Sequence, residues 1–263
     1  MVFMLPFYRL FPLDAAILVY PMKRLLISDA HLTGLQDPNQ ALLVDLLMKT
    51  DADEVYFLGD VFHFWWGQAG YRDPDFEPFL SAIERLRERQ ISCHWVRGNH
   101  DFHLGPVLEE DLGVVVADQF RLTISGAEVL LVHGDEADRS FGYRLTKAVL
   151  RGRVFAGLMN RLSPERVKFI GQKMAGSSRD HMGSNTRLLL AQEEWATAQH
   201  KSGVDVVVLG HSHAPGISQL ASGILVNLGD FVQAHTYLEI DSELRLCRWR
   251  SGHGDTIEKQ RIL

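Results

Sequence analysis

Short apolar runs that end abruptly in Gly, Asp, Asn or His residues recur along this chain and constrain its fold more than any other feature. Runs bounded by such turn-forming residues are typical of buried strands. Each predicted strand therefore opens at its C-terminal end into a loop that carries residues able to bind metal ions. The predicted strands are Leu25–Ile27, Val55–Leu58, Ile91–Val96, Val129–Val132 and Val204–Leu209.

The segments between and after these runs indicate a layered architecture. Helical patterns cover about residues 38–50 and 74–89, and short alternating strands return at Ile224–Asn227, Thr236–Ile240 and Leu244–Trp249. Strands that alternate with helices and then give way to further strands favour an α/β fold. The expected arrangement is a sheet sandwich flanked by helices.

The composition is that of an ordinary globular protein. The chain has 263 residues, of which 46% are hydrophobic and 23% charged, and its net charge is −6. That charge argues against nucleic acid as a partner. The two cysteines, Cys93 and Cys247, lie far apart with no metal-type spacing, which favours free thiols in a reducing compartment.

Residues 1–21 are apolar but do not form a clean membrane span, because Arg9, Asp14 and three prolines interrupt them. They also lack a convincing small-residue cleavage site. Met22 opens the sequence MKRLLISDAHL, which is typical of a natural N-terminus. We therefore expect residues 1–21 to be an extension that is not native or is loosely ordered, and residues 22–263 to form the main domain.

Residues 137–200 interrupt the strand pattern with amphipathic helices, which predicts a helical cap inserted into the main domain. Between Arg139 and Arg187 the chain carries eleven Lys and Arg residues, and only Glu165 and Asp180 oppose them. A basic, apolar cap on an acidic body suits an anionic small molecule, a lipid substrate or the surface of the inner membrane. An ordinary solvated helical insertion is the alternative.

Five segments carry metal-type residues at the ends of predicted strands. They are Asp29-x-His31, Gly59-Asp60, Gly98-Asn99-His100-Asp101, His133-Gly134-Asp135 and Gly210-His211-Ser212-His213. Any one of these segments occurs by chance in many proteins, but chance does not explain all five in this order, each at the end of a predicted strand. Because alternate residues of a strand share a face, Asp29 and His31 are expected to point the same way, as are His211 and His213.

These residue types suit the hydrolysis of an anionic phosphate ester or anhydride. Two divalent cations about 3.5–4 Å apart neutralise such a phosphate and lower the pKa of a bridging water. Ions that close need a shared anionic ligand, and Asp60 is the candidate. Mixed imidazole, carboxylate and amide ligands favour Mn, Fe, Co or Zn over Mg or Ca, with Mn as the first candidate.

The five segments resemble those of the calcineurin-like metallophosphoesterase superfamily over about residues 23–240. The resemblance implies a four-layer αββα sandwich that carries two metal ions and cleaves phosphate esters. It also implies that His100 contacts the phosphate or protonates the leaving group, with Asn99 and Asp60 beside it. The implied ligands of the first metal are Asp29, His31, Asp60 and His213, and those of the second are Asp60, Asn99, His133 and His211.

The segments GDVFHFWWG at 59–67 and GNHDFHLG at 98–105 resemble, more narrowly, the UDP-2,3-diacylglucosamine pyrophosphohydrolases of lipid A biosynthesis. That resemblance implies attack of metal-activated water on the α-phosphorus, releasing UMP and 2,3-diacylglucosamine 1-phosphate. It further implies that the helical cap holds the acyl chains. The implied substrate contacts are Trp65, Tyr143, Ser177 and Arg179.

Two departures leave other substrates open. The best-studied branch of that family has Arg where this chain has His100, and the cap aligns poorly around Ser177 and Arg179. The alternative is a phosphoesterase or phosphodiesterase acting on another nucleotide-linked or lipid-linked substrate. The acidic body argues against a nuclease, and a module that only binds a partner would not depend on the metals.

Neighbouring residues are expected to support the site and not to bind metal. His63 and His103 are predicted at its rim, and Asp101 and Asp135 as carboxylates that orient metal-bound histidines. The missing signal sequence and the basic cap predict a cytoplasmic protein at the surface of the inner membrane. The oligomeric state cannot be predicted from the sequence.

Overall fold

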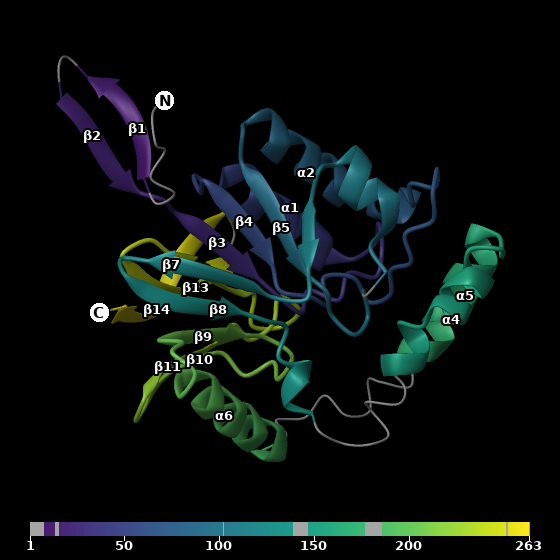
Figure 1. Cartoon of the computed structure of the whole chain (residues 1–263). Coiled ribbons are helices and arrows are strands. Elements are labelled where there is room, and N and C mark those ends of the chain that lie inside the picture. Colours follow the sequence, from purple (N-terminus) through teal and green to yellow (C-terminus); the bar gives the residue numbers. More distant parts are fainter. Residues whose placement is uncertain are drawn as a thin grey trace.

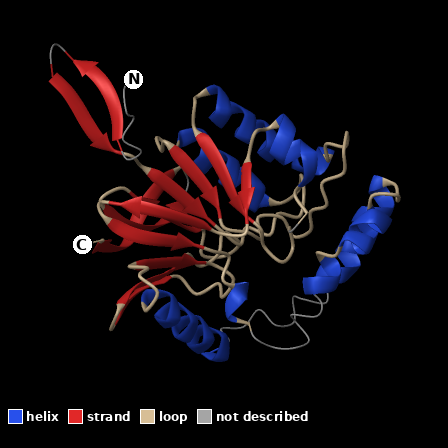
Figure 2. Cartoon of the chain, in the orientation of Figure 1, coloured by secondary structure: helices blue, strands red, loops and turns tan. Residues whose placement is uncertain are grey.

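Two β-sheets packed face to face form the centre of the computed structural model of this chain (Figure 1). The structure describes residues 8–13, 16–101, 103–138, 147–176, 186–250 and 252–262. Helices lie on the outer sides of the two sheets (Figure 2). Near the N-terminus, β1 (Tyr8–Leu13) and β2 (Ala16–Pro21) pair with each other as a separate antiparallel hairpin.

The larger sheet has seven strands in the order β14-β13-β12-β3-β4-β5-β6. Strands β3 to β6 run parallel to one another, and β12, β13 and β14 extend the sheet in antiparallel fashion on the other side of β3. The bounds are β3 Arg24–Ile27, β4 Glu54–Phe57, β5 Ser92–Val96, β6 Val115–Ala117, β12 Thr236–Ile240, β13 Glu243–Arg250 and β14 His253–Arg261.

The smaller sheet has five strands in the order β10-β11-β9-β8-β7. Its three central strands are parallel, and each edge strand pairs antiparallel with its neighbour. The bounds are β7 Phe120–Ile124, β8 Ala127–Leu131, β9 Val206–Leu209, β10 Gly216–Leu220 and β11 Gly223–Asn227.

Apolar side chains of both sheets fill the space between them, where Leu26 and Tyr56 of the larger sheet join one cluster with Val208 of the smaller. Helices α1 (Pro38–Lys49) and α2 (Glu77–Glu88) pack on the outer face of the larger sheet. Helix α6 (Thr186–His200) packs on β9 and β11 of the smaller sheet. This order of layers confirms the predicted αββα sandwich.

The local sequence explains where the helices begin and which face they bury. The side chain of Asp37 accepts a hydrogen bond from the backbone N–H of Asn39 at 2.9 Å and caps α1. In α2, Phe79, Ile83 and Leu86 recur at helical spacing and are all buried in the core. Shorter helical turns are η1 Pro74–Phe76, η2 Val107–Asp111 and η3 Asp135–Ala137.

Helices α4 (Arg153–Met159) and α5 (Pro164–Gly176) form a unit apart from both sheets (Figure 1). From here on, the cap is the segment 153–176, which contains both helices and lies within the predicted insertion. Trp66, from the loop after β4, packs with Met159 and Val167 in an apolar cluster that joins the cap to that loop. The predicted boundaries of the cap insertion, 137–200, and of the extension, 1–21, stay predictions.

The strands and helices predicted from apolar patterns are present. Within the described residues, those patterns do not predict the hairpin strands β1 and β2 or four further strands of the two sheets, β6, β7, β10 and β14. All four are edge strands of the two sheets. Their residues are mostly half-buried or exposed, so they lack the apolar run that marks a central strand.

A histidine with little polar contact lies near the edge of the inter-sheet core. His94 of β5 stacks on Tyr56 of β4, with ring centroids 4.4 Å apart, and contacts the edge of Phe120. Neither ring nitrogen of His94 has a hydrogen-bond partner among the described residues. Burial lowers the pKa of His94 below its ordinary value, although Glu54, 3.9 Å away, acts in the opposite direction.

This environment predicts that His94 contributes to acid sensitivity. Because the pKa of His94 is lower in the folded than in the unfolded chain, unfolding takes up a proton below about pH 6.5, and stability is lost as the pH falls. In metal-free protein, His94→Phe should therefore lose less unfolding free energy between pH 7.5 and pH 5 than the wild type does. Urea unfolding at both pH values measures this, with the exposed His253→Phe as control. An unchanged pH dependence in His94→Phe would contradict it.

Candidate metal centre

The loops that follow β3, β4, β5, β8 and β9 meet at one edge of the sandwich, and backbone hydrogen bonds fix them to one another. The Asp29 N–H donates to the Gly59 carbonyl at 3.1 Å, and the His31 N–H donates to the Asp60 carbonyl at 3.0 Å. The Gly210 N–H donates to the His133 carbonyl at 2.9 Å. The sheet topology therefore brings together side chains that lie up to about 180 residues apart in the sequence.

A first group contains Asp29, His31 and His213, each of which can direct one ligand atom to a common point. His213 Nε2 lies 3.3 Å from His31 Nε2 and 3.3 Å from Asp29 Oδ1. Asp29 is fully buried, and its Oδ1 has no hydrogen-bond partner within the described part of the chain. Its other oxygen, Oδ2, accepts from the backbone N–H of His211 at 2.8 Å.

A second group contains Asp60, His133 and His211. His133 Nε2 lies 3.5 Å from Asp60 Oδ2 and 3.1 Å from Asn99 Oδ1. His133 is fully buried, and its Nδ1 donates to the Leu58 carbonyl at 2.8 Å. Because a carbonyl oxygen can only accept, this bond keeps a proton on Nδ1 and leaves Nε2 facing Asp60 and Asn99.

Asp60 is held so that its two oxygens face different partners. Oδ1 accepts from the backbone N–H groups of Asn99 at 2.8 Å and His100 at 2.9 Å, whereas Oδ2 faces His133. Burial raises the pKa of Asp60, but His133 and His100 outweigh it and hold the pKa well below its usual range. Burial lowers the pKa of His133, and Asp60 more than reverses this, raising it well above its ordinary value.

The backbone at these residues differs from the extended geometry expected from the sequence. The dihedral φ is positive at Asp29 (51°), His31 (42°), Asp60 (55°), His211 (68°) and His213 (56°), which is uncommon for residues other than glycine. Strand alternation therefore does not set the orientation of these side chains, although Asp29 and His31 do direct their ligand atoms to a common group as predicted. His211 and His213 do not share a group, because each turns into a different one of the two clusters.

Two glycines make room for the carboxylates. A Cβ at Gly98 would lie 2.1 Å from Asp60 Oδ1, and a Cβ at Gly210 would lie 2.3 Å from Asp29 Oδ2. Neither carboxylate could move aside without losing its backbone hydrogen bonds. The glycines before Asn99 and before His211 are therefore required by close packing around the site.

His100 and His63 extend the cluster beyond the predicted ligands. His100 Nδ1 donates to the His63 carbonyl at 2.8 Å, and its Nε2 lies 3.9 Å from Asp60 Oδ2. His63, His31 and His100 form a third group whose ring nitrogens lie within 4.8 Å of one another. From its place in the sequence, His63 is predicted only at the rim of the site. His103 instead stacks on Trp66, with ring centroids 4.1 Å apart.

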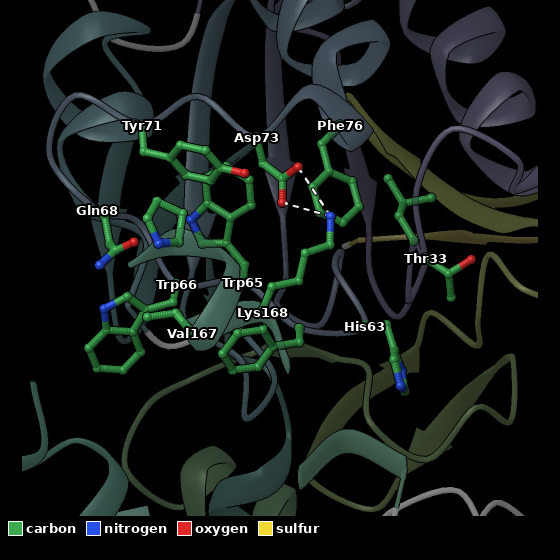
Figure 3. A pocket seen from close by; sticks show the side chains of 13 residues that line it. Thr33, His63, Trp65, Trp66, Gln68, Tyr71, Asp73, Phe76, Val167 and Lys168 are labelled. Atoms are coloured by element: carbon green, nitrogen blue, oxygen red, sulfur yellow. Dashed lines mark hydrogen bonds and ion pairs between the residues drawn. The ribbon is translucent and has the colours of Figure 1, made fainter. Parts of the chain in front are cut away.

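A cavity lies beside the centre, between the loop after β4 and the cap (Figure 3). Apolar side chains such as Phe64, Trp65 and Val167 line it together with Lys168, which forms an ion pair with Asp73 at 3.3 Å.

Trp65, predicted as a substrate contact, is almost fully buried and donates from Nε1 to the Leu104 carbonyl at 2.8 Å. Its ring stacks on Phe62 and also lines the cavity, so the predicted contact stays a prediction. The other predicted substrate contacts, Tyr143, Ser177 and Arg179, lie outside the described residues.

The model of the calcineurin-like phosphoesterase family matches residues 22–215, which include all five metal-type segments. The chain belongs to the calcineurin-like phosphoesterase family. It is accordingly a metal-dependent hydrolase, and the family implies divalent metal ions at the site.

Individual relatives of this phosphoesterase carry a narrower name. The UDP-2,3-diacylglucosamine hydrolase of Aeromonas salmonicida is 31% identical over 204 residues, covering 74% of this chain and 79% of that protein. The protein of the same name from Stenotrophomonas maltophilia is 29% identical over 245 residues, covering 84% and 96%. Among solved structures, the Escherichia coli phosphoesterase Yfce aligns with a TM-score of 0.45 at 18% identity, covering 92% of this chain and 100% of that chain.

The side chains of the phosphoesterase fit divalent metal ions. In the groups around Asp29 and Asp60, imidazole nitrogens and carboxylate oxygens converge with lone pairs facing one another, and such atoms repel unless a proton or a metal ion lies between them. The buried Asp29 Oδ1, which lacks a hydrogen bond within the described residues, is the clearest instance. Mixed nitrogen and oxygen donors also match the preferences of Mn, Fe, Co and Zn.

Asp101 supports the centre in a way that differs from the prediction. Its Oδ1 accepts from the backbone N–H groups of Gly98 and Asp60, both at 3.0 Å, and its Oδ2 accepts from Val61 N–H at 2.8 Å. It therefore joins the loops after β4 and β5 through their backbones and does not orient a histidine ring. Asp135 forms an ion pair with Lys147 at 2.6 Å.

Asp101→Asn should weaken both the fold and the metal centre. The amide can accept only through one oxygen, so at least one buried N–H group loses its partner, at a cost of about 1–3 kcal/mol in unfolding free energy. The affinity for Mn²⁺ should fall in parallel, because both loops carry predicted ligands. Urea unfolding and Mn²⁺ titration measure the two effects, with the exposed Asp118→Asn as control. Wild-type values for Asp101→Asn would contradict the role of this carboxylate.

Proposed function

We propose that this phosphoesterase hydrolyses the diphosphate bond of UDP-2,3-diacylglucosamine in lipid A biosynthesis, giving UMP and 2,3-diacylglucosamine 1-phosphate. The observation that carries the proposal is the position of an apolar cavity directly beside the cluster of buried carboxylates and imidazoles. The charged diphosphate of this substrate matches the cluster, and its acylated sugar matches the apolar cavity. The name shared by these relatives, UDP-2,3-diacylglucosamine hydrolase, supports the same substrate.

Seven residues are proposed to hold two divalent metal ions, with Asp60 shared between them. When bound, such ions neutralise the phosphate and supply an activated water at neutral pH. The proposed ligands are Asp29, His31, Asp60 and His213 for one ion and Asp60, Asn99, His133 and His211 for the other. Mn is the first candidate, with Fe, Co or Zn as alternatives.

His100 is proposed to contact the phosphate or to protonate the leaving group. Its Nδ1 proton is held by the His63 carbonyl, which fixes the ring and leaves Nε2 facing the centre near Asp60. The backbone N–H groups of Asn99 and His100 both donate to Asp60 Oδ1, so Asn99 and Asp60 orient this part of the site.

The proposal is tested by hydrolysis of UDP-2,3-diacylglucosamine with Mn-loaded protein, next to a bis-aryl phosphate and metal-free protein. Efficient release of UMP with poor turnover of the aryl diester is the expected result. Turnover of the aryl diester alone would contradict the lipid substrate and favour a phosphodiesterase acting on another nucleotide-linked or lipid-linked compound.

Asp60→Asn should abolish turnover while leaving the fold intact, because the amide keeps the size of the side chain but lacks the negative charge that two ions share. We expect a loss larger than the 10- to 100-fold that is typical of a residue that only supports a ligand. Metal analysis should show fewer ions per chain. Circular dichroism checks the fold. Wild-type turnover with a full complement of metal would rule out the shared carboxylate.

The outer surface of the cap is proposed to rest on the inner membrane. Val154, Leu158 and Phe169 are exposed by 80%, 56% and 58%, and the same segment carries four exposed basic residues, Arg153, Arg161, Arg166 and Lys173. Apolar side chains among basic ones suit a surface of anionic lipids. Among the described residues, no helix is long and apolar enough to cross a membrane.

Replacing these three apolar residues by Ser should weaken binding to vesicles of phosphatidylethanolamine and phosphatidylglycerol about tenfold or more, since less apolar surface leaves water. Sedimentation with vesicles measures the binding. The control replaces Leu35, Val115 and Ile257, which are exposed apolar residues outside the cap, in the same way. Equal losses in both variants would contradict docking through the cap.

A further inference from the structure

His63 lies where the metal centre meets the cavity. It belongs to the loop after β4, three residues beyond Asp60, and its backbone N–H donates to the Leu32 carbonyl at 2.9 Å. Its carbonyl holds His100, as described above. Both polar groups of the His63 backbone are thus hydrogen-bonded, which fixes the point from which its side chain extends.

The imidazole of His63 faces the centre on one side. Its ring centroid lies 5.7 Å from that of His100 and 6.4 Å from that of His31. The ring nitrogens of the three histidines lie within 4.8 Å of one another. The same side chain also lines the cavity, and Figure 3 shows it at the edge of the lining group, away from Trp66 and Gln68.

The spacing of these nitrogens suits a phosphate group. Two hydrogen bonds of about 2.8 Å to one oxygen span up to about 5.6 Å between the donor nitrogens, and contacts to two oxygens of one phosphate span more. His63 and His100 can therefore both reach a single phosphate. His31 already belongs to the group with Asp29 and His213, so a separate metal ion on the three histidines would compete with that site for the same ring.

We propose that His63 binds the second phosphate of a diphosphate substrate, the one that is not attacked and leaves with the sugar. This inference rests on the proposed function, because it assumes that the attacked phosphorus lies on the metal-binding groups. The neighbouring phosphate must then lie beside them, and the side toward the cavity is where the apolar part of the substrate is proposed to bind. His63 is the described residue that belongs to both the histidine cluster and the cavity lining.

His63 therefore makes the site selective for diphosphates over simple phosphodiesters. A neutral imidazole N–H suffices for the contact, so the selectivity needs no change of charge on the ring. Removing the side chain leaves the His63 carbonyl in place to hold His100. The variant thus separates recognition of the second phosphate from the remainder of the centre.

The test compares wild type, His63→Ala and His63→Gln in the full-length, Mn-loaded protein, with His253→Ala on β14 as control. Calorimetry gives the Kd of UMP and of the α,β-methylene analogue of UDP, which has a second phosphate and is not cleaved at that bridge. We expect His63→Ala to lose about 10- to 100-fold in the affinity for the analogue relative to UMP. Gln, which can donate through its amide, should restore part of it. Metal content should match that of the wild type, and turnover of a bis-aryl phosphate should fall less than the affinity for the analogue does.

An unchanged ratio of the two Kd values in His63→Ala would overturn the proposal. Equal losses for UMP, the analogue and the aryl diester, or a loss of metal, would overturn it as well, since His63 would then support the metal centre. These outcomes do not depend on the lipid substrate. If the wild type cleaves the aryl diester but not UDP-2,3-diacylglucosamine, the proposed function fails, and the Kd ratio still decides the role of His63.

Discussion

The centre is built around the negative charges of Asp29 and Asp60, which are buried where the ends of the strands meet. Each carboxylate has one oxygen fixed by backbone N–H groups of another loop: Asp29 by His211, and Asp60 by Asn99 and His100. The other oxygen of each faces histidines. Since a buried carboxylate without compensation costs several kcal/mol, the site requires positive charge, and protonated His133 or bound metal ions can supply it.

The loop from Gly59 to Phe76 connects this charged centre to the cap. Asp60 lies at its start, and further along Trp66 donates from Nε1 to Asn160 Oδ1 at 2.8 Å. Gln68 donates to the Leu162 carbonyl at 2.9 Å, and Asp73 pairs with Lys168 of α5. One continuous segment therefore supplies a predicted metal ligand, the wall of the cavity and the contacts that hold the cap. A shift of the backbone of this loop is therefore expected to affect metal binding and substrate binding together, whereas the loss of one side chain such as that of His63 is expected to affect substrate binding alone.

Much of the fold follows from sequence patterns because the central strands are buried on both faces. Val206 to Leu209, for example, form an uninterrupted apolar run with both sides in the core. The edge strand β14 has no such run, since almost all of its residues are exposed, and its pairing with β13 depends on tertiary contacts. Residue types therefore predict the interior well and the sheet edges poorly.

For the candidate site, too, the sequence predicts one aspect well and another poorly. Residue order predicts which side chains meet, and the groups seen around Asp29 and Asp60 contain six of the seven predicted ligands, with Asn99 at hydrogen-bonding distance from His133. The geometry depends on positive φ angles that no alternation pattern encodes. The backbone contacts of Asp101 and the inward position of His63 likewise arise from how the loops pack.

Whether two metal ions share the Asp60 carboxylate is most directly tested by electron paramagnetic resonance of the metal-free protein during titration with Mn²⁺. The proposed ligand set predicts that two ions bind per chain and that their spectrum is that of a magnetically coupled pair, because ions that share a carboxylate would lie about 3.5–4 Å apart. Binding of a single ion, or of two ions that give the separate signals of isolated Mn²⁺, would contradict a shared centre at Asp60.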